Sequence, residues 1–254
     1  MNALDELRRR AAEAAVITDF DGTLSPIAPT PEAALALDGV PDALEDLATG
    51  YALVAVLSGR RAAEVAALLG RPRGVRVVGL YGLEDGDGPT DTPEHPHVVD
   101  GVLADLERVA ARVPGARIER KGANVAVHYR GAPDPARARQ MLLAELDAVA
   151  TAGGLRVLEG KKVVELAPAG GPTKGDALRH LMGQHPLRAV LYAGDDVADL
   201  DAFDAVTDLR DHGMVGVTVA VRSAETPASL IDRATVVVEG PEGMLDVLRG
   251  LRPD

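Results

Sequence analysis

Six short runs of apolar, mostly β-branched residues alternate with segments that have the periodicity of helices, and this alternation limits the possible folds. Continuous apolar runs of this kind are typical of strands buried on both faces, as in a parallel sheet with helices packed on each side. The runs cover residues 14–18, 51–57, 75–80, 187–193, 215–221 and 234–239. The sequence therefore predicts an α/β core built on a doubly wound parallel sheet.

The middle of the chain has a different pattern. Between about Pro96 and Pro168 the expected order is helix, strand, strand, helix, strand, strand, and these strands alternate polar with apolar residues. Alternation keeps one face of a sheet polar, which predicts an open-faced α+β unit. Glycine- and proline-rich flanks at 85–97 and 167–173 are typical of linkers. The predicted division is a core of residues 1–95 and 169–254 with an α+β insert at 96–168.

Composition excludes several classes of protein. With 39 acidic and 27 basic side chains, the net charge of −12 argues against a nucleic-acid partner. The chain lacks cysteine, which excludes disulfides, thiolate zinc sites and cysteine nucleophiles. It has no unbroken apolar stretch of membrane-spanning length and no signal-like N-terminus. We expect a soluble, cytoplasmic protein without a membrane partner; the oligomeric state stays open, with a monomer favoured.

Polar side chains follow three of the predicted strands at the points where they end. Asp19 and Asp21 follow the first run, Ser58-Gly59-Arg60 the second, and Asp195 and Asp196 the fourth. In an open parallel sheet the carboxyl ends of the strands lie along one edge, where ligands bind. We therefore expect these residues to converge.

The segment Asp19-Phe20-Asp21-Gly22-Thr23 has two structural alternatives to a chemical role. A hairpin turn at Asp-Gly needs a following strand, but the next residues, LSPIAPTP, contain three prolines. A calcium-binding loop needs a glycine and a glutamate at fixed positions that this segment lacks. The pair of carboxylates then favours chemistry in which one attacks and the other transfers protons.

Two further motifs fit an anion. Ser58 could simply be the N-cap of a helix that ends near Leu69, yet its hydroxyl and the N–H groups that follow also suit a phosphate oxygen, and both readings stay open. Thr173 is expected to cap a helix that begins with Lys174. A cation is unfavourable at that end of the helix dipole unless an anion lies nearby.

Five aspartates crowd the segment GDDVADLDAFD at Asp195, Asp196, Asp199, Asp201 and Asp204. An acidic helix N-terminus explains one or two of them. Adjacent carboxylates at the end of a strand repel each other unless a divalent cation lies between them, and oxygen ligands suit Mg²⁺. The sequence predicts a magnesium site here, whereas His95 and His97 are expected to belong to a proline-rich linker.

In sequence order, DFDGT, LSGR, TKGDAL and YAGDD resemble the four motifs of the haloacid-dehalogenase superfamily. DFDGTLSPI, IERKGANVAVHYR, GKKVVEL, TKGDAL and GDDVADLDAF further resemble segments of trehalose-6-phosphate phosphatases, over nearly the whole chain. This resemblance implies a Rossmann-like core and a mobile inserted cap. It also implies Mg²⁺-dependent hydrolysis of trehalose 6-phosphate through an aspartyl phosphate, with hinges expected at 86–96 and 169–172.

The resemblance also implies residue roles. Asp19 would be the nucleophile and Asp21 the general acid and base. Asp19, Asp195 and the backbone carbonyl of Asp21 would hold Mg²⁺. Asp196 and Asp199 would contact these ligands or bind the metal through water. Ser58 and Lys174 would grip the phosphoryl oxygens. The implied substrate-binding set is Ser58, Gly59, Arg60, Glu119, Lys121, Asn124, His128, Arg130 and Glu165.

Strand alternation gives the cap residues separate support. In ANVAVHYR, Asn124, His128 and Arg130 are expected on one face of the sheet, opposite to the face of the apolar residues that alternate with them. Only 2 % of the chain is aromatic, so sugar recognition is expected to rest on hydrogen bonds from charged and amide groups.

The chain departs from the family pattern at five positions, which are Tyr81, Asn124, Ala167, Ala198 and Leu200. These departures concentrate around the cap and leave open a different glycosyl phosphate or sugar-like metabolite phosphate as substrate. A phosphoacceptor signalling domain is a second alternative, but it would not need the insert. A non-catalytic sugar-phosphate binder is a third, and the pair Asp19 and Asp21 argues against it.

Overall fold

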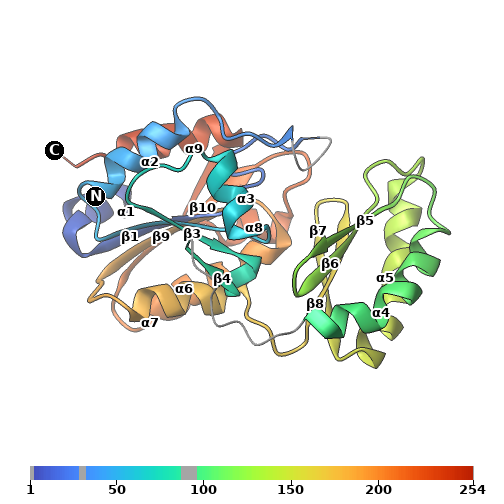
Figure 1. Ribbon diagram of the computed structural model, residues 1–254. Helices are drawn as coiled ribbons and strands as arrows, with labels where there is room; N and C mark the ends of the chain where they lie inside the picture. Colours follow the sequence, from blue (N-terminus) through green and yellow to red (C-terminus); the bar gives the residue numbers. More distant parts are fainter. Residues whose placement is uncertain (1–2, 29–32, 87–95, 254) are drawn as a thin grey trace. The chain divides into compact units, whose positions relative to one another are not determined.

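A computed structural model describes residues 3–28, 33–86 and 96–253 (Figure 1). The chain forms two compact units, one made of Met1–Thr90 and Pro172–Asp254 and the other of Asp91–Gly171. The insert predicted at 96–168 falls inside the second unit. Most of the first predicted linker, including His95, lies outside the described residues, as does the side chain of His97.

The first unit, here called the core unit, is built on a seven-stranded sheet in the order β11-β10-β9-β1-β2-β3-β4. All neighbouring pairs are parallel except β3 and β4. The strands are β1 (Ala14–Thr18), β2 (Leu53–Leu57), β3 (Val75–Gly79), β4 (Glu84–Asp85), β9 (Ala189–Gly194), β10 (Val215–Arg222) and β11 (Val236–Glu239). Each of the six predicted runs coincides with one parallel strand, β9 and β10 each ending one residue beyond the run, so the predicted fold class is confirmed; the short antiparallel β4 was not predicted.

Helices cover both faces of this sheet. Along β1, Ala14 and Val16 pack on one hydrophobic cluster while Ala15 and Ile17 pack on the other. On the first side lie α1 (Ala3–Arg9), α2 (Val40–Ala48), α3 (Ala62–Leu68) and α9 (Gly240–Gly250), and on the second α6 (Lys174–Gly183), α7 (Leu200–Asp211) and α8 (Ala228–Arg233). Among the described residues, the 3₁₀ turns η1 (Ala11–Glu13), η3 (Leu80–Gly82) and η4 (Val197–Asp199) connect these elements. None of the described helices is long and apolar enough to cross a bilayer.

The second unit, here called the insert, has a four-stranded antiparallel sheet in the order β5-β6-β8-β7. Its strands are β5 (Arg117–Lys121), β6 (Asn124–His128), β7 (Leu155–Gly160) and β8 (Val163–Pro168), and its helices are α4 (Pro96–Ala110) and α5 (Pro135–Ala152). Val125, Val127 and Tyr129 pack with both helices in one hydrophobic cluster. Because side chains alternate along a strand, the opposite face carries the polar residues of β5, β6 and β8.

The position of β1 in the middle of the core sheet determines which residues meet. Thr18 at the end of β1 pairs with Val56 of β2 on one side and with Ala193 of β9 on the other. One residue later, the Asp19 N–H donates to the Ala193 carbonyl at 2.8 Å. The residues that follow β1, β2 and β9 therefore emerge side by side at the carboxyl edge of the sheet.

Candidate active site

Asp19 lies at the end of a strand whose five residues are all buried, and its own exposed fraction is only 5 %. The chain then turns back on itself, with the Gly22 N–H donating to the Ser25 carbonyl at 2.7 Å. Gly22 has a φ of 81°, which glycine adopts without the steric cost that a side chain brings. The turn leaves the Asp21 side chain 39 % exposed. One carboxylate is thus buried and the other reaches solvent.

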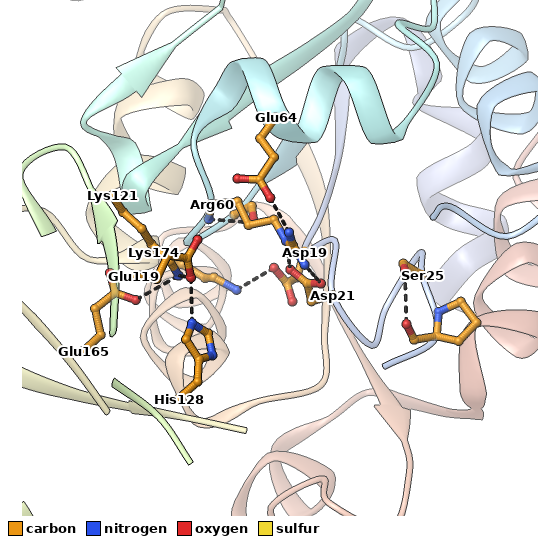
Figure 2. A network of polar contacts seen from close by, with 12 residues as sticks. Asp19, Asp21, Ser25, Arg60, Glu64, Glu119, Lys121, His128, Glu165 and Lys174 are labelled. Atoms are coloured by element: carbon orange, nitrogen blue, oxygen red, sulfur yellow. Dashed lines mark hydrogen bonds and ion pairs between the residues drawn. The ribbon is translucent and has the colours of Figure 1, made fainter. Parts of the chain in front are cut away.

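Lys174 reaches Asp19 from the first turn of α6. Thr173 caps this helix as predicted: its Oγ1 accepts from the Asp176 N–H at 3.2 Å while the Asp176 carboxylate accepts from the Thr173 N–H at 3.0 Å. The Lys174 side chain is 4 % exposed, and its Nζ lies 2.8 Å from Asp19 Oδ1 and 2.6 Å from Asp199 Oδ1 (Figure 2 shows the pair with Asp19). These two carboxylates supply the negative charge that a cation at a helix N-terminus needs.

Asp199 is fully buried and accepts hydrogen bonds from several groups of the site. Its Oδ1 accepts from Lys174 Nζ and from the Tyr192 hydroxyl, both at 2.6 Å. Its Oδ2 accepts from the backbone N–H groups of Asp195 and Asp196, both at 2.9 Å. Two partners on each oxygen use the ordinary acceptor capacity of a carboxylate. Asp199 therefore orients the lysine and the 194–196 turn.

Three carboxylates gather closely enough to hold a cation. Oxygens of Asp19, Asp195 and Asp199 lie within 4.8 Å of one another, and all three residues are buried. Hard oxygen ligands suit Mg²⁺. Because Asp199 is already saturated, Asp19 and Asp195 are the better candidates for direct ligands. Asp196 lies outside this group, and its Oδ1 accepts from the Val197 N–H at 2.7 Å at the start of η4.

The charges at this site depend on one another. Burial raises the pKa of Asp19 to about 7, although the neighbouring Lys174 acts to lower it. Burial also works against the charged form of Lys174, but Asp19 and Asp199 outweigh it and raise the pKa of the ammonium group above its usual value. Lys174 therefore stays charged. A divalent cation beside Asp19 would favour its ionised form, because an opposite charge stabilises a carboxylate.

Arg60 binds both carboxylate oxygens of Asp21 through one edge of its guanidinium group. Its Nε donates to Asp21 Oδ2 at 2.7 Å and its Nη2 to Oδ1 at 2.8 Å, while Nη1 contacts Glu64 on α3 (Figure 2). The guanidinium also lies 6.0 Å from the centre of the Phe20 ring. Sequence reasoning gave Arg60 a substrate-binding role and did not foresee these partners. Only the i, i+4 spacing of Arg60 and Glu64 could have indicated part of the network.

Ser58 does not cap α3, so that alternative from the sequence is wrong. The helix begins at Ala62, and Glu84 Oε2 from β4 accepts from the Ala62 N–H at 2.8 Å. Ser58 Oγ instead accepts from the Arg60 N–H at 3.1 Å inside the loop that follows β2. Glu84 carried no local signal in the sequence, because the two-residue strand that holds it has no pattern of its own.

The polar face of the insert carries a second network. Glu165 Oε1 accepts from Asn124 Nδ2 at 2.7 Å, and Lys121 Nζ lies 3.5 Å from Glu165 Oε2. His128 Nε2 lies 2.6 Å from Glu119 Oε2. Strand register explains these contacts, because Glu119 and Glu165 both pair with the same residue of β6.

Arg130 contacts the turn between β7 and β8. It follows the end of β6, and its Nη2 donates to the Lys161 carbonyl at 3.0 Å. The contacts of the polar face, together with a distance of 3.7 Å between Lys121 Nζ and Glu119 Oε2, link five of the six predicted sugar-binding residues in one network.

The chain is similar to known trehalose-phosphate phosphatases. A family model described as trehalose-phosphatase matches residues 17–234. A trehalose-phosphate phosphatase of Mycobacterium marinum is 39 % identical over 240 residues, which cover 88 % of this chain and 57 % of that protein. The chain thus spans little more than half the length of this relative.

Solved structures show the same fold. The C-terminal domain of a trehalose-6-phosphate phosphatase from C. albicans superposes with a TM-score of 0.85 at 23 % identity, covering 99 % of this chain and 97 % of that one. A haloacid dehalogenase-like hydrolase from Bacteroides thetaiotaomicron gives a TM-score of 0.65 at 14 % identity, covering 94 % and 99 %. The likeness extends over both units of the chain.

Proposed function

Because the chain belongs to the trehalose-phosphatase family, we propose that it hydrolyses trehalose 6-phosphate to trehalose and phosphate. The observation that carries the proposal is the buried carboxylate of Asp19 at the end of β1, with Lys174 Nζ 2.8 Å away and Asp195 among its neighbours. A nucleophile, a fixed cation and a second acidic ligand are what phosphoryl transfer to a carboxylate requires.

Asp19 is the nucleophile. Its oxygen forms a bond to phosphorus as the bond from phosphorus to the sugar oxygen breaks, which leaves an aspartyl phosphate. Asp21 gives a proton to the departing sugar oxygen and then takes one from a water molecule, whose oxygen attacks the same phosphorus and releases Asp19 and phosphate. The 39 % exposure of the Asp21 side chain supports this role, since the carboxyl group must exchange protons with water and sugar.

Positive charge makes the attack possible. A phosphate monoester dianion repels a carboxylate, and Lys174 offsets that repulsion from a position fixed by Asp199. Ser58 and the backbone N–H groups after β2 bind phosphoryl oxygens. Mg²⁺ held by Asp19 and Asp195, with the backbone carbonyl of Asp21 as a further ligand, supplies Lewis-acid stabilisation of the developing charge when it is bound.

The insert recognises the sugar. The network of Glu119, Lys121, Asn124, His128 and Glu165 presents acceptors and donors that suit sugar hydroxyls, and Arg130 just after the end of β6 is a further donor. The insert acts as a cap that excludes water from the first step. Of its two predicted hinges, the one at 86–96 lies mostly outside the described residues. A different glycosyl phosphate is the alternative substrate. Asn124 favours it, because the side-chain amide donates to Glu165 and this changes which donors are left to bind a sugar.

The substrate is tested by measuring phosphate release from a panel of sugar phosphates with and without Mg²⁺. We expect strong preference for trehalose 6-phosphate and loss of activity when a chelator removes the metal, with recovery on adding Mg²⁺ back. Preference for another glycosyl phosphate would assign the alternative substrate. Full activity in chelator would contradict the metal proposal and leave the hydrolysis itself in place.

Removing the carboxylate of Glu165 should weaken sugar binding without affecting the chemistry. For Glu165→Ala we expect KM for the sugar phosphate to rise at least about tenfold, because hydrogen bonds to a charged group are worth about 1.5–3 kcal/mol. Hydrolysis of p-nitrophenyl phosphate, which has no sugar, should stay unchanged.

The matched control is Glu159→Ala on the neighbouring strand β7, where the carboxylate accepts from Arg139 Nε at 2.7 Å and has no proposed contact with substrate. Its KM should equal that of the wild type. An equal fall in both activities of Glu165→Ala would count against a role in sugar recognition.

A further inference from the structure

The segment after β3 has an unusual backbone conformation. Leu80 and Tyr81 are consecutive residues with φ values of 48° and 60°, in the left-handed region that side chains disfavour. Strain of this kind persists only where the surroundings enforce it, and it concentrates at functional sites. The preceding Gly79 shows how closely the backbone is packed, because a Cβ there would lie 2.2 Å from the Ala62 nitrogen.

This conformation turns two backbone donors toward the loop that follows β2. The Leu80 N–H donates to the Arg60 carbonyl at 2.8 Å, and the Tyr81 N–H donates to the Ser58 carbonyl at 3.0 Å. On the strand side, the Ser58 N–H donates to the Val78 carbonyl at 2.9 Å. The loop 58–60 is thus held at both ends by the segment 78–81.

The Tyr81 side chain holds the middle of the same loop. A Cβ built on Gly59 would lie 2.6 Å from the Tyr81 Oη and 2.7 Å from its Cζ. Real Cβ atoms essentially never approach other atoms this closely, so the phenol ring occupies the space that a side chain at position 59 would need and would have to move to admit one. A glycine at 59 and the ring of Tyr81 therefore depend on each other.

We propose that Tyr81 is a positioning residue for phosphoryl transfer: its ring, packed on Gly59, and its strained backbone keep the loop 58–60 in place. This inference rests on the proposed function, since the loop carries the Ser58 hydroxyl and the Arg60 that holds Asp21. A displacement of such groups by about 1 Å can lower the rate about 100-fold, so the loss of the contact between Tyr81 and the loop should have a measurable effect.

A double-mutant cycle tests the contact between residues 59 and 81. Gly59→Ala and Tyr81→Asn should each lower kcat at least about tenfold with little change in KM, because the first pushes the ring away from the loop and the second removes the ring. Asparagine is chosen since it tolerates positive φ. In the double variant the new methyl group has room, so its kcat should match that of Tyr81→Asn alone. If the fold-loss of kcat in the double variant equals the product of the two single losses, the residues act independently and the inference is overturned.

Two controls separate positioning from stability and from strain. Tyr81→Phe keeps the ring and should retain kcat within about twofold, whereas a loss as large as that of Tyr81→Asn would overturn the role of the ring. Arg71 has a φ of 57° away from the loop, so Arg71→Asn relaxes similar strain and should leave kcat unchanged. Thermal unfolding should show Tyr81→Asn fully folded at the assay temperature, so that unfolding cannot account for its lower kcat.

Affinity for inorganic phosphate in the presence of Mg²⁺ is measured on the same four proteins of the cycle. A wild type that releases phosphate from no sugar phosphate contradicts the proposed function, and the coupling is then read from phosphate affinity. An active wild type with independent effects at 59 and 81 contradicts the positioning inference alone. Absence of phosphate binding by an inactive wild type contradicts both.

Discussion

Asp19→Asn lowers kcat for phosphate release by about 10⁴-fold or more, the scale of loss seen when an essential nucleophile is removed. The amide has almost the same shape as the carboxylate but cannot attack phosphorus or balance the charge of a cation. Burial already disfavours the charged form of Asp19, as its raised pKa of about 7 shows. The variant should therefore unfold at a temperature no lower than the metal-free wild type.

The measurement combines phosphate release with mass spectrometry of protein quenched in acid during turnover. The wild type should carry one phosphoryl group on the peptide that contains Asp19, and the variant none. Asp201→Asn, in the same acidic segment but outside the proposed site, is the matched control and should keep its activity. Normal turnover by Asp19→Asn would rule out this residue as the nucleophile.

Lys174→Met lowers the free energy of unfolding by about 3–5 kcal/mol in metal-free buffer and abolishes phosphate release. The lysine side chain is 4 % exposed and lies between two carboxylates, at 2.8 Å from Asp19 and 2.6 Å from Asp199. Removing its charge leaves Asp19 without its cation and Asp199 with only neutral hydrogen-bond donors, which is far more costly than losing a surface ion pair. Urea denaturation gives the change in stability.

The double variant Lys174→Met/Asp199→Asn is the control for this charge argument. It removes the charge of one of the two buried carboxylates, so it should recover part of the stability while staying inactive. Mg²⁺ should stabilise the single variant more than the wild type, since it replaces missing positive charge. A loss below about 1 kcal/mol in the single variant would show that this contact is worth no more than a surface ion pair.

Much of the site could be predicted because it follows from strand order and helix capping. The apolar runs placed Asp19, Ser58 and Asp195 at strand ends, and parallel pairing then brings those ends to one edge. The Thr173 cap set Lys174 in the first turn of α6, as its spacing indicated. These are local rules whose outcome changes little with side-chain conformation.

The remaining features depend on contacts between segments distant in sequence. The bidentate pair of Arg60 and Asp21 requires the loops after β1 and β2 to approach in one particular way. The Glu84 cap on α3 depends on a two-residue strand, and the packing of Tyr81 on Gly59 depends on positive φ angles that Leu and Tyr rarely adopt. No periodicity or composition in the sequence reports such features.

The pairing of β1 with β9 also governs how the chain can fold. These central strands are neighbours in the core sheet, yet the whole insert lies between them in sequence. The insert has its own hydrophobic cluster, and all its strand pairs lie within the insert; β5–β6 and β7–β8 are pairs of consecutive strands, and such local pairings form quickly. During synthesis the insert can therefore fold while one edge of β1 is still unpaired. The core sheet is then completed last, and aggregation is most favoured in the period when that edge of β1 is exposed.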